Sequence, residues 1–208
     1  MTVILLLGLC PLIQACVMPR PEAPPIHTYQ LTLEAWSGEQ SAVRSGTGPV
    51  LLVAQPQADP GFDTPRMAFL RRRYELEYYA LSQWADTPAR MLMPLLVEAL
   101  NRETRWRAVV AMPASIKADY RLETYSLVLQ QEFHRQPSRA RVAARMQLVD
   151  LNNQRIVGTR TFEAVEDAAT DDAYGGVVAA NHAVARWLEQ IRAWTVACTT
   201  NGRDCGPS

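Results

Sequence analysis

The fold is decided by the stretch PGFDTPRMAFLRRRYELEYYALSQWADTP, residues 60–88, which ends in the second of two Asp-Thr-Pro triplets. Asp and Thr side chains accept hydrogen bonds from nearby backbone N–H groups, and proline disfavours helix for the residue before it. Each triplet, at 63–65 and at 86–88, is therefore expected to be a sharp structural boundary.

Between the triplets the sequence predicts a pair of strands. Residues 74–78, YELEY, alternate between apolar and acidic side chains, which is the period of a half-buried strand. Residues 67–70 form a shorter partner strand before the arginine run at 71–73.

A helix is expected after the second triplet. Its apolar residues recur at helical spacing along one stripe that packs on the sheet: Met91, Leu92, Leu95, Leu96, Ala99 and Leu100. Pro94 removes one backbone hydrogen bond inside this segment. We therefore expect either a kink or a helix that starts nearer Met93.

The remaining strands are predicted from the same periodicity. Residues 29–33 alternate and form a first strand, and residues 50–54, VLLVA, have no polar face and form a central strand covered on both sides. Another strand is expected at 106–112, and residues 119–165 read as a three-stranded antiparallel meander.

The middle strand of the meander has one apolar face and one arginine face. The apolar face holds Ala140, Val142, Ala144, Met146 and Leu148, and the opposite face holds Arg139, Arg141 and Arg145. A turn at 152–154 should set Ala144 opposite Phe162. In the strand before it the apolar residues change parity between Leu122 and Tyr125, which indicates a β-bulge or a change of packing environment.

A second helix is expected after Asp171-Asp172, which caps it, and it should run to about Trp194. The pair Gly175-Gly176 near its start is costly in a helix unless another part of the chain packs closely there. Strands, helix, strands and helix together predict an α+β fold with a largely antiparallel sheet and two principal helices packed on one face.

The N-terminus is interpreted as an export signal. Residues 1–15 are apolar and uncharged, too short to span a bilayer comfortably, and end in Ala15 before Cys16. The run IQAC at 13–16 resembles a bacterial lipobox in which Cys16 is lipidated; a plain secretory signal or an anchor helix is the alternative. Residues 16–25 would then be a lipidated cysteine and proline-rich spacer, 26–195 the folded domain and 196–208 a C-terminal tail.

Two cysteines, Cys198 and Cys205, remain near the C-terminus. In an oxidising compartment such a pair favours a disulfide, with free thiols as the alternative. A zinc site is disfavoured because two cysteines without nearby histidines leave a tetrahedral site unfilled.

Composition and motifs point away from catalysis. Lys plus Arg and Asp plus Glu both number 21, so net charge gives no argument for nucleic acid. The three histidines, His27, His134 and His182, stand at no motif spacing, and no nucleophile, phosphate-loop or zinc-protease motif occurs. We expect no enzyme activity, no cofactor and no metal, and we expect His182 to be an ordinary half-buried side chain.

Two groups of arginines are candidates for docking a partner. One is Arg71, Arg72 and Arg73 at the hairpin end, and the other is Arg139, Arg141 and Arg145 on the meander. For each the alternative is a solvated surface, with Glu75 and Glu77 neutralising the hairpin end.

The aromatic residues and the residues of the two triplets can be explained by their roles in the fold. Tyr74, Tyr78, Tyr79 and Trp84 are candidates for lining a groove, although core packing is the simpler interpretation. Caps and turns account for most of the remaining set, which is Asp63, Thr64, Pro65, Arg66, Asp86, Thr87 and Pro88.

Longer motifs resemble a known family. The runs PGFDTPRMAF, YELEYYALSQWADTPARML and PLLVEAL, followed by segments at 149–151, 162–164 and 174–181, closely resemble the ABC-type transport auxiliary lipoproteins, the PqiC-like proteins. These motifs reflect the fold and include no catalytic signature.

The resemblance implies a non-catalytic accessory lipoprotein of an MCE-type ABC transporter that moves lipids between inner and outer membranes. Such a protein is anchored through Cys16 on the periplasmic face of the outer membrane and docks, as a homo-oligomer, on the MCE-domain protein. The alternative function is a periplasmic carrier that holds lipid in an apolar groove.

Overall fold

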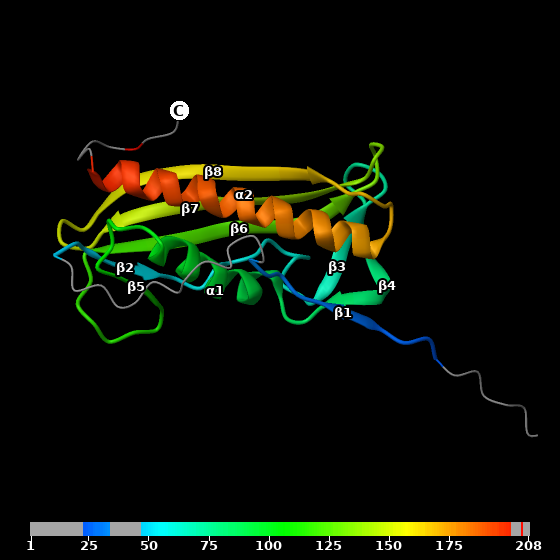
Figure 1. Cartoon of the computed structure of the whole chain (residues 1–208), viewed down its shortest axis with the longest axis horizontal. Coiled ribbons are helices and arrows are strands. Elements are labelled where there is room, and N and C mark those ends of the chain that lie inside the picture. Colours follow the sequence, from blue (N-terminus) through cyan, green and yellow to red (C-terminus); the bar gives the residue numbers. More distant parts are fainter. Residues whose placement is uncertain (1–22, 34–46, 201–204, 206–208) are drawn as a thin grey trace, which may run out of the picture.

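The computed structural model describes residues 23–33, 47–200 and 205. In this part of the chain two helices cover one face of an eight-stranded sheet, which is an α+β fold (Figure 1). The expected signal peptide, Cys16 and most of the expected spacer lie outside the described residues.

The elements follow in chain order. The strands are β1 (His27–Tyr29), β2 (Val50–Val53), β3 (Arg66–Leu70), β4 (Leu76–Trp84), β5 (Ala108–Ala111), β6 (Tyr120–Glu132), β7 (Arg139–Asp150) and β8 (Arg155–Asp167), and the helices are α1 (Pro88–Asn101) and α2 (Ala173–Thr200).

The sheet is mixed, which corrects the expectation of a largely antiparallel one. The meander β6–β7–β8 and the hairpin β3–β4 are antiparallel. However, β2 runs parallel to β5 and β6, β3 runs parallel to β6, and β1 runs parallel to β4. The long strand β6 pairs with β2 near its start and with β3 near its end. Alternation within a strand reports which face is buried but not which strand lies beside it, so these pairings were not predictable.

The meander confirms the register inferred from the sequence. Ala144 lies opposite Phe162. The bulge expected in β6 is present, but it lies between Tyr125 and Val128, after Tyr125 rather than before it, and Ser126 there adopts a φ of 52°. Every residue of β2 is buried, as its apolar sequence predicts.

The β3–β4 hairpin forms between the two triplets, but Tyr74 does not belong to a strand. Tyr74 lies in the turn with a φ of 71°, and 98% of its surface is exposed. The strand therefore begins at Leu76, and Tyr74 is not part of the aromatic core.

Helix α1 begins at Pro88 rather than near Met93. The side chain of Thr87 accepts a hydrogen bond from Arg90 N and caps the helix. Proline fits the first helical position because its missing N–H would have no partner there in any case. Pro94 lies on the exposed side of α1, opposite the apolar stripe that packs into the core.

Helix α2 continues beyond Trp194 to Thr200, so the expected tail begins later than residue 196. Asp172 Oδ1 accepts a hydrogen bond from Gly175 N at 2.7 Å and caps the first turn. Gly176 lies against Gln131 of β6, because a Cβ at residue 176 would stand 2.0 Å from Gln131 Oε1. This is the close packing that the glycine pair required.

Buried Gln131 joins three segments at this point. Its Oε1 accepts a hydrogen bond from Tyr79 OH at 2.9 Å, and its Nε2 donates to Ser138 Oγ at 2.9 Å and to Asp172 O at 3.2 Å. The start of α2 is thereby held against the middle of β4 and the end of β6.

The end of the chain contacts strand β8. Cys198 and Cys205 form a disulfide, and Cys205 N donates a hydrogen bond to Val157 O at 3.0 Å. Gly158 permits this approach, since a Cβ there would stand 2.4 Å from Cys205 O.

The core lies between the helices and the sheet. Its fully buried side chains come from both layers and include Leu92, Leu96, Met146, Leu148, Trp187 and Ile191. On the other face of the sheet a small apolar cluster covers β2, and no helix of the described chain lies over β6, β7 and β8 (Figure 1). That open face carries the arginines of β7.

Candidate interaction surfaces

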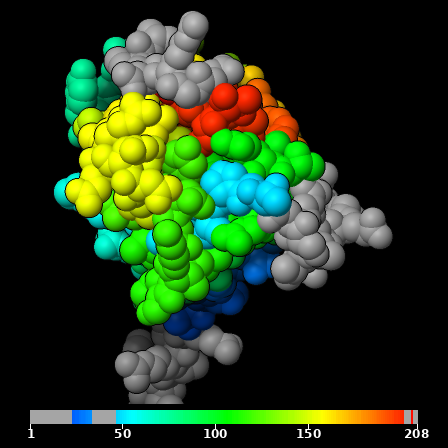
Figure 2. All heavy atoms as spheres, turned by 90° about the vertical axis from the view of Figure 1, so that its left-hand side faces the viewer, coloured from blue at the N-terminus to red at the C-terminus, as the bar shows by residue number. Residues whose placement is uncertain are grey.

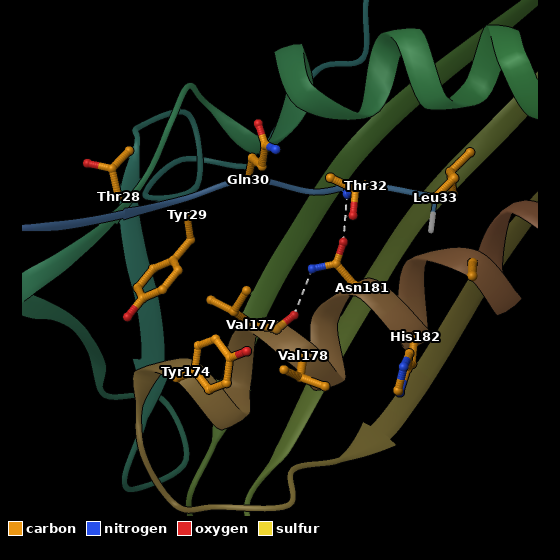
Figure 3. A pocket seen from close by; sticks show the side chains of 11 residues that line it. Thr28, Tyr29, Gln30, Thr32, Leu33, Tyr174, Val177, Val178, Asn181 and His182 are labelled. Carbon is orange, nitrogen blue, oxygen red and sulfur yellow. Dashed lines mark hydrogen bonds between the residues drawn. The ribbon is translucent and has the colours of Figure 1, made fainter. Parts of the chain in front are cut away.

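A groove lies between segment 28–33 and the first half of α2 (Figure 3). Its volume is about 420 Å³, and the rings of Tyr29 and Tyr174 stand at one end with centroids 6.3 Å apart. Leu33, Val177 and Val178 contribute apolar surface, and none of the described residues that line the groove is an Asp, Glu, Lys or Arg. Its lining suits an apolar or aromatic group rather than an ion.

Asn181 fastens segment 28–33 to α2. Its Oδ1 accepts a hydrogen bond from Thr32 N at 2.6 Å, and its Nδ2 donates to Val177 O at 2.9 Å (Figure 3). The neighbouring His182 is exposed, not half-buried as expected. The groove was not predicted from the sequence, in which its signal is Asn181 after the apolar run 177–180.

The arginine face of β7 exists, but two of its three members are already paired. Arg139 contacts Glu132 Oε2 at 2.8 Å, and Arg141 contacts Glu163 Oε2 at 2.6 Å. Arg145 is exposed and forms no ion pair within the described chain. Arg145 is therefore the member of this face that is most available to a partner.

Glu132 is a buried carboxylate on this face. Burial opposes its ionisation, but hydrogen bonds from Gln130 and Arg139 and the charge of Arg139 lower its pKa below the usual value. Replacing Arg139 with an acidic residue would thus place two carboxylates together, so Arg139 is not a neutral surface position.

The arginines at 71–73 lie at the tip of the β3–β4 hairpin and are exposed. Arg71 lies 3.8 Å from Glu77, and Arg72 lies 4.0 Å from Glu75, as the neutralised alternative predicted. Arg73 forms no ion pair within the described residues.

An aromatic cluster supports this tip. Phe69 packs against Tyr79 at 4.7 Å and edge-to-face against Phe133 at 5.8 Å. Burial and the nearby Asp172 raise the pKa of Tyr79, which is therefore neutral in its hydrogen bond to Gln131. A depression of about 640 Å³ beside the cluster is lined by Arg71, Glu77 and Asp171 as well as by the rings. Trp84 lies apart from this depression in the core, with 4% of its surface exposed.

The two triplets act as turns and caps, and the structure brings them together. Arg66 N donates to Thr64 Oγ1 at 3.3 Å, Trp84 N donates to Pro65 O at 2.7 Å, and Thr87 N donates to Asp86 Oδ1 at 2.7 Å. The contact between Trp84 and Pro65 closes the open end of the hairpin.

Both triplets also border one shallow depression. Asp63 and Thr87 line a space of about 480 Å³ together with Arg90 and residues of 55–58. The guanidinium of Arg66 instead stacks on Tyr78, 3.8 Å from the ring centroid. No local pattern predicts this shared depression, because it depends on how the hairpin closes.

The described residues hold no group of His, Cys, Asp and Glu suited to a metal. Their helices also include none that is long and apolar enough to cross a membrane.

The model of the family described as the ABC-type transport auxiliary lipoprotein component matches residues 29–192. Protein XCC0632 from Xanthomonas campestris, of the DUF330 family, has a TM-score of 0.68 at 22% identity, over 86% of this chain and 96% of that one. Hypothetical protein CT253 from Chlamydia trachomatis has a TM-score of 0.50 at 7% identity, over 74% and 99%. At these identities the likeness shows the fold alone. No curated protein sequence matches the chain.

Proposed function

Because the chain belongs to the family of ABC-type transport auxiliary lipoprotein components, we propose that it is a non-catalytic accessory lipoprotein that docks on the MCE-domain protein of an ABC-type lipid transporter. The observation that carries this proposal is the family match across residues 29–192. We further propose that Cys16 anchors the chain on the periplasmic face of the outer membrane and that the protein acts as a homo-oligomer.

The open face of the sheet supports a docking role. A strand displays side chains in a rigid row, so a partner can bind them at little cost in conformational entropy. Arg145 stands in that row beside Tyr125 of β6, and arginine and tyrosine are enriched at interfaces. We therefore place the docking face around Arg145, with the hairpin arginines as the second candidate.

The docking role is tested by purifying the tagged, natively exported protein and identifying its partners and lipids by mass spectrometry. We expect an MCE-domain protein and no stoichiometric lipid. Arg145→Glu should weaken that complex about tenfold or more, which is about 1.4 kcal/mol. The matched control is Arg160→Glu, an exposed arginine of β8 outside this row. Recovery without any MCE protein would contradict the proposal.

The groove beside α2 supports the alternative function, a lipid carrier. Its volume of about 420 Å³ falls in the range typical of small-molecule sites, and aliphatic and aromatic side chains line it together with uncharged polar ones. A carrier should copurify with lipid, and Val178→Trp, which fills the groove, should displace that lipid. Lipid-free protein that still binds an MCE protein would exclude the carrier function.

A further inference from the structure

The tip of the β3–β4 hairpin holds an aromatic side chain in an unfavourable position. Tyr74 has a φ of 71°, a region that bulky residues rarely adopt, and it is 98% exposed. Its ring contacts no other aromatic ring in the described chain. Strain and exposure that no ring contact within the described residues offsets indicate a role outside the chain.

A second turn lies beside this tip. β3 and β6 are parallel with Leu70 opposite Glu132, so the turns that follow them leave the sheet at the same level. Phe133 N donates a hydrogen bond to Leu70 O at 2.8 Å, and the Phe133 ring packs on Phe69. The exposed Arg135 of the second turn thereby joins the hairpin tip.

Together these two turns form a surface that we call the basic end, made of Arg71, Arg72, Arg73, Tyr74 and Arg135. The pairs of Arg71 and Arg72 with Glu77 and Glu75 are exposed and long, so water weakens them. Within the described residues Arg73 and Arg135 form no ion pair. Arg73 and Arg135 can therefore pair with phosphate directly. Arg71 and Arg72 must first leave their glutamates, and Asp171 borders this surface beside Arg71.

The chain that precedes the domain leaves toward the same end. β1 is parallel to β4, with His27 opposite Ser82, so the backbone before His27 heads toward Leu76 and the hairpin tip. From Ser82 back to Leu76 is roughly 20 Å along a strand. A segment of 11 residues, such as 16–26, would span about 34 Å as a polyproline helix, which is more than this distance. A bilayer that holds the acyl chains of Cys16 therefore lies within reach of the basic end.

From these observations we infer that the basic end binds the membrane surface itself, by its anionic phospholipid headgroups. The arginines pair with lipid phosphates, and Tyr74 enters the interfacial region, which favours amphipathic rings. This inference rests on the proposed lipid anchor at Cys16. It orients the domain with its long axis away from the bilayer and the opposite end toward the periplasm.

The test uses the full chain, exported and processed by its host, purified in detergent and placed in vesicles. A fluorophore is attached at Tyr74→Cys or, as the control, at Thr104→Cys. Thr104 is exposed and precedes β5, whose start lies beside the starts of β2 and β6, at the end of the sheet opposite the hairpin tip. Figure 2 shows that end of the molecule, with the β7–β8 turn (yellow) and the end of α2 (red) toward the viewer. The vesicles contain phosphatidylethanolamine and phosphatidylglycerol, or phosphatidylcholine alone, with a headgroup-linked nitroxide quencher.

We expect the label at residue 74 to be quenched at least about twofold more than the label at residue 104, and more strongly with phosphatidylglycerol. Arg73→Glu with Arg135→Glu should remove this difference. The matched double variant Arg107→Glu with Lys117→Glu, exposed residues outside the basic end, should keep it.

Three outcomes separate the inference from the proposed function. Preferential quenching at residue 74 that depends on Arg73 and Arg135 supports it. If the chain floats with the vesicles but both labels are quenched equally, the anchor stands and the inference is wrong. If the chain does not float with the vesicles, the proposed lipid anchor at Cys16 is wrong, and the inference, which depends on that anchor, is wrong as well.

Discussion

The side chain of Gln131 occupies the place where a Cβ of residue 176 would stand, with Oε1 2.0 Å from that position. Alanine normally stabilises a helix over glycine by about 1 kcal/mol. Gly176→Ala should instead destabilise this protein by about 2 kcal/mol, because buried Gln131 would have to move and give up hydrogen bonds. Urea unfolding measures the loss. His182→Ala, an exposed change in the same helix, should stay within about 0.5 kcal/mol of the unmodified protein.

Asn181 should control how firmly segment 28–33 is attached. Asn181→Ala leaves Thr32 N without its acceptor and should cost about 1 to 2 kcal/mol. Hydrogen exchange at the Thr32 amide should accelerate. Asn181→Asp keeps an oxygen for Thr32 N but loses the donor to Val177 O, so it should restore most of the amide protection. Unchanged exchange in the alanine variant would show that other contacts hold the segment.

The stability of the fold should depend on pH through Glu132. Its folded pKa is lowered, so the ionised carboxylate stabilises the fold above its unfolded pKa of about 4.3, and this contribution disappears as the pH falls through the folded pKa. The difference in unfolding free energy between the unmodified protein and Glu132→Gln should therefore be largest near neutral pH and shrink in acid. The pKa values of Asp119 and Asp150 are also lowered. Both residues are present in the unmodified protein and in the variant, so their contributions cancel in the difference in unfolding free energy. A constant difference from neutral to acid pH would contradict this role.

The strain at Tyr74 should be measurable. Tyr74→Ala keeps a Cβ at a φ of 71°, whereas Tyr74→Gly removes it. Relief of the strain favours the glycine variant, whereas the greater freedom of its unfolded chain opposes it. We expect the relief of strain to be the larger effect, so the glycine variant should be more stable than the alanine variant by about 0.5 to 1 kcal/mol. Thermal unfolding of the two variants decides this, and equal melting temperatures would mean that the turn relaxes. The exposed ring itself should contribute little to stability.

The bond between Cys198 and Cys205 is open to a direct chemical check. In the protein as exported, alkylation under denaturing conditions should leave both cysteines unmodified until a reductant is added. Mass spectrometry of the C-terminal peptide reads out both states. Free thiols in periplasmic material would show that the pair is not oxidised in its own compartment.

Much of the fold was predictable because it depends on local patterns. The register that sets Ala144 opposite Phe162 follows from turn length and the alternation of buried side chains. The change of parity after Leu122 also indicated a bulge in β6, although the bulge itself lies beyond Tyr125. The mixed pairing of the sheet was not predictable, because β2 and β3 meet β6 through contacts between distant parts of the chain.

The candidate surfaces were predictable only in part. The arginines of β7 share one face, as alternation requires, yet their partners Glu132 and Glu163 lie on two other strands. The groove depends on Asn181 reaching Thr32, which is 149 residues away, and no local pattern encodes that contact. Tyr74 was misplaced because an exposed tyrosine in a turn continues the alternation of the strand that follows it.

The attachment of Cys205 to β8 limits how copies of this protein can join. Of the three edge strands in the described sheet, β1 has three residues and β5 has four, but β8 has 13. A long edge with unpaired backbone groups invites strands from other molecules and leads to fibrous aggregates. The bridge between Gly158 and Cys205 occupies the start of this edge with the chain's own tail. Copies that associate near this end of β8 must therefore do so through side chains, which permits a closed ring and opposes open-ended sheet growth.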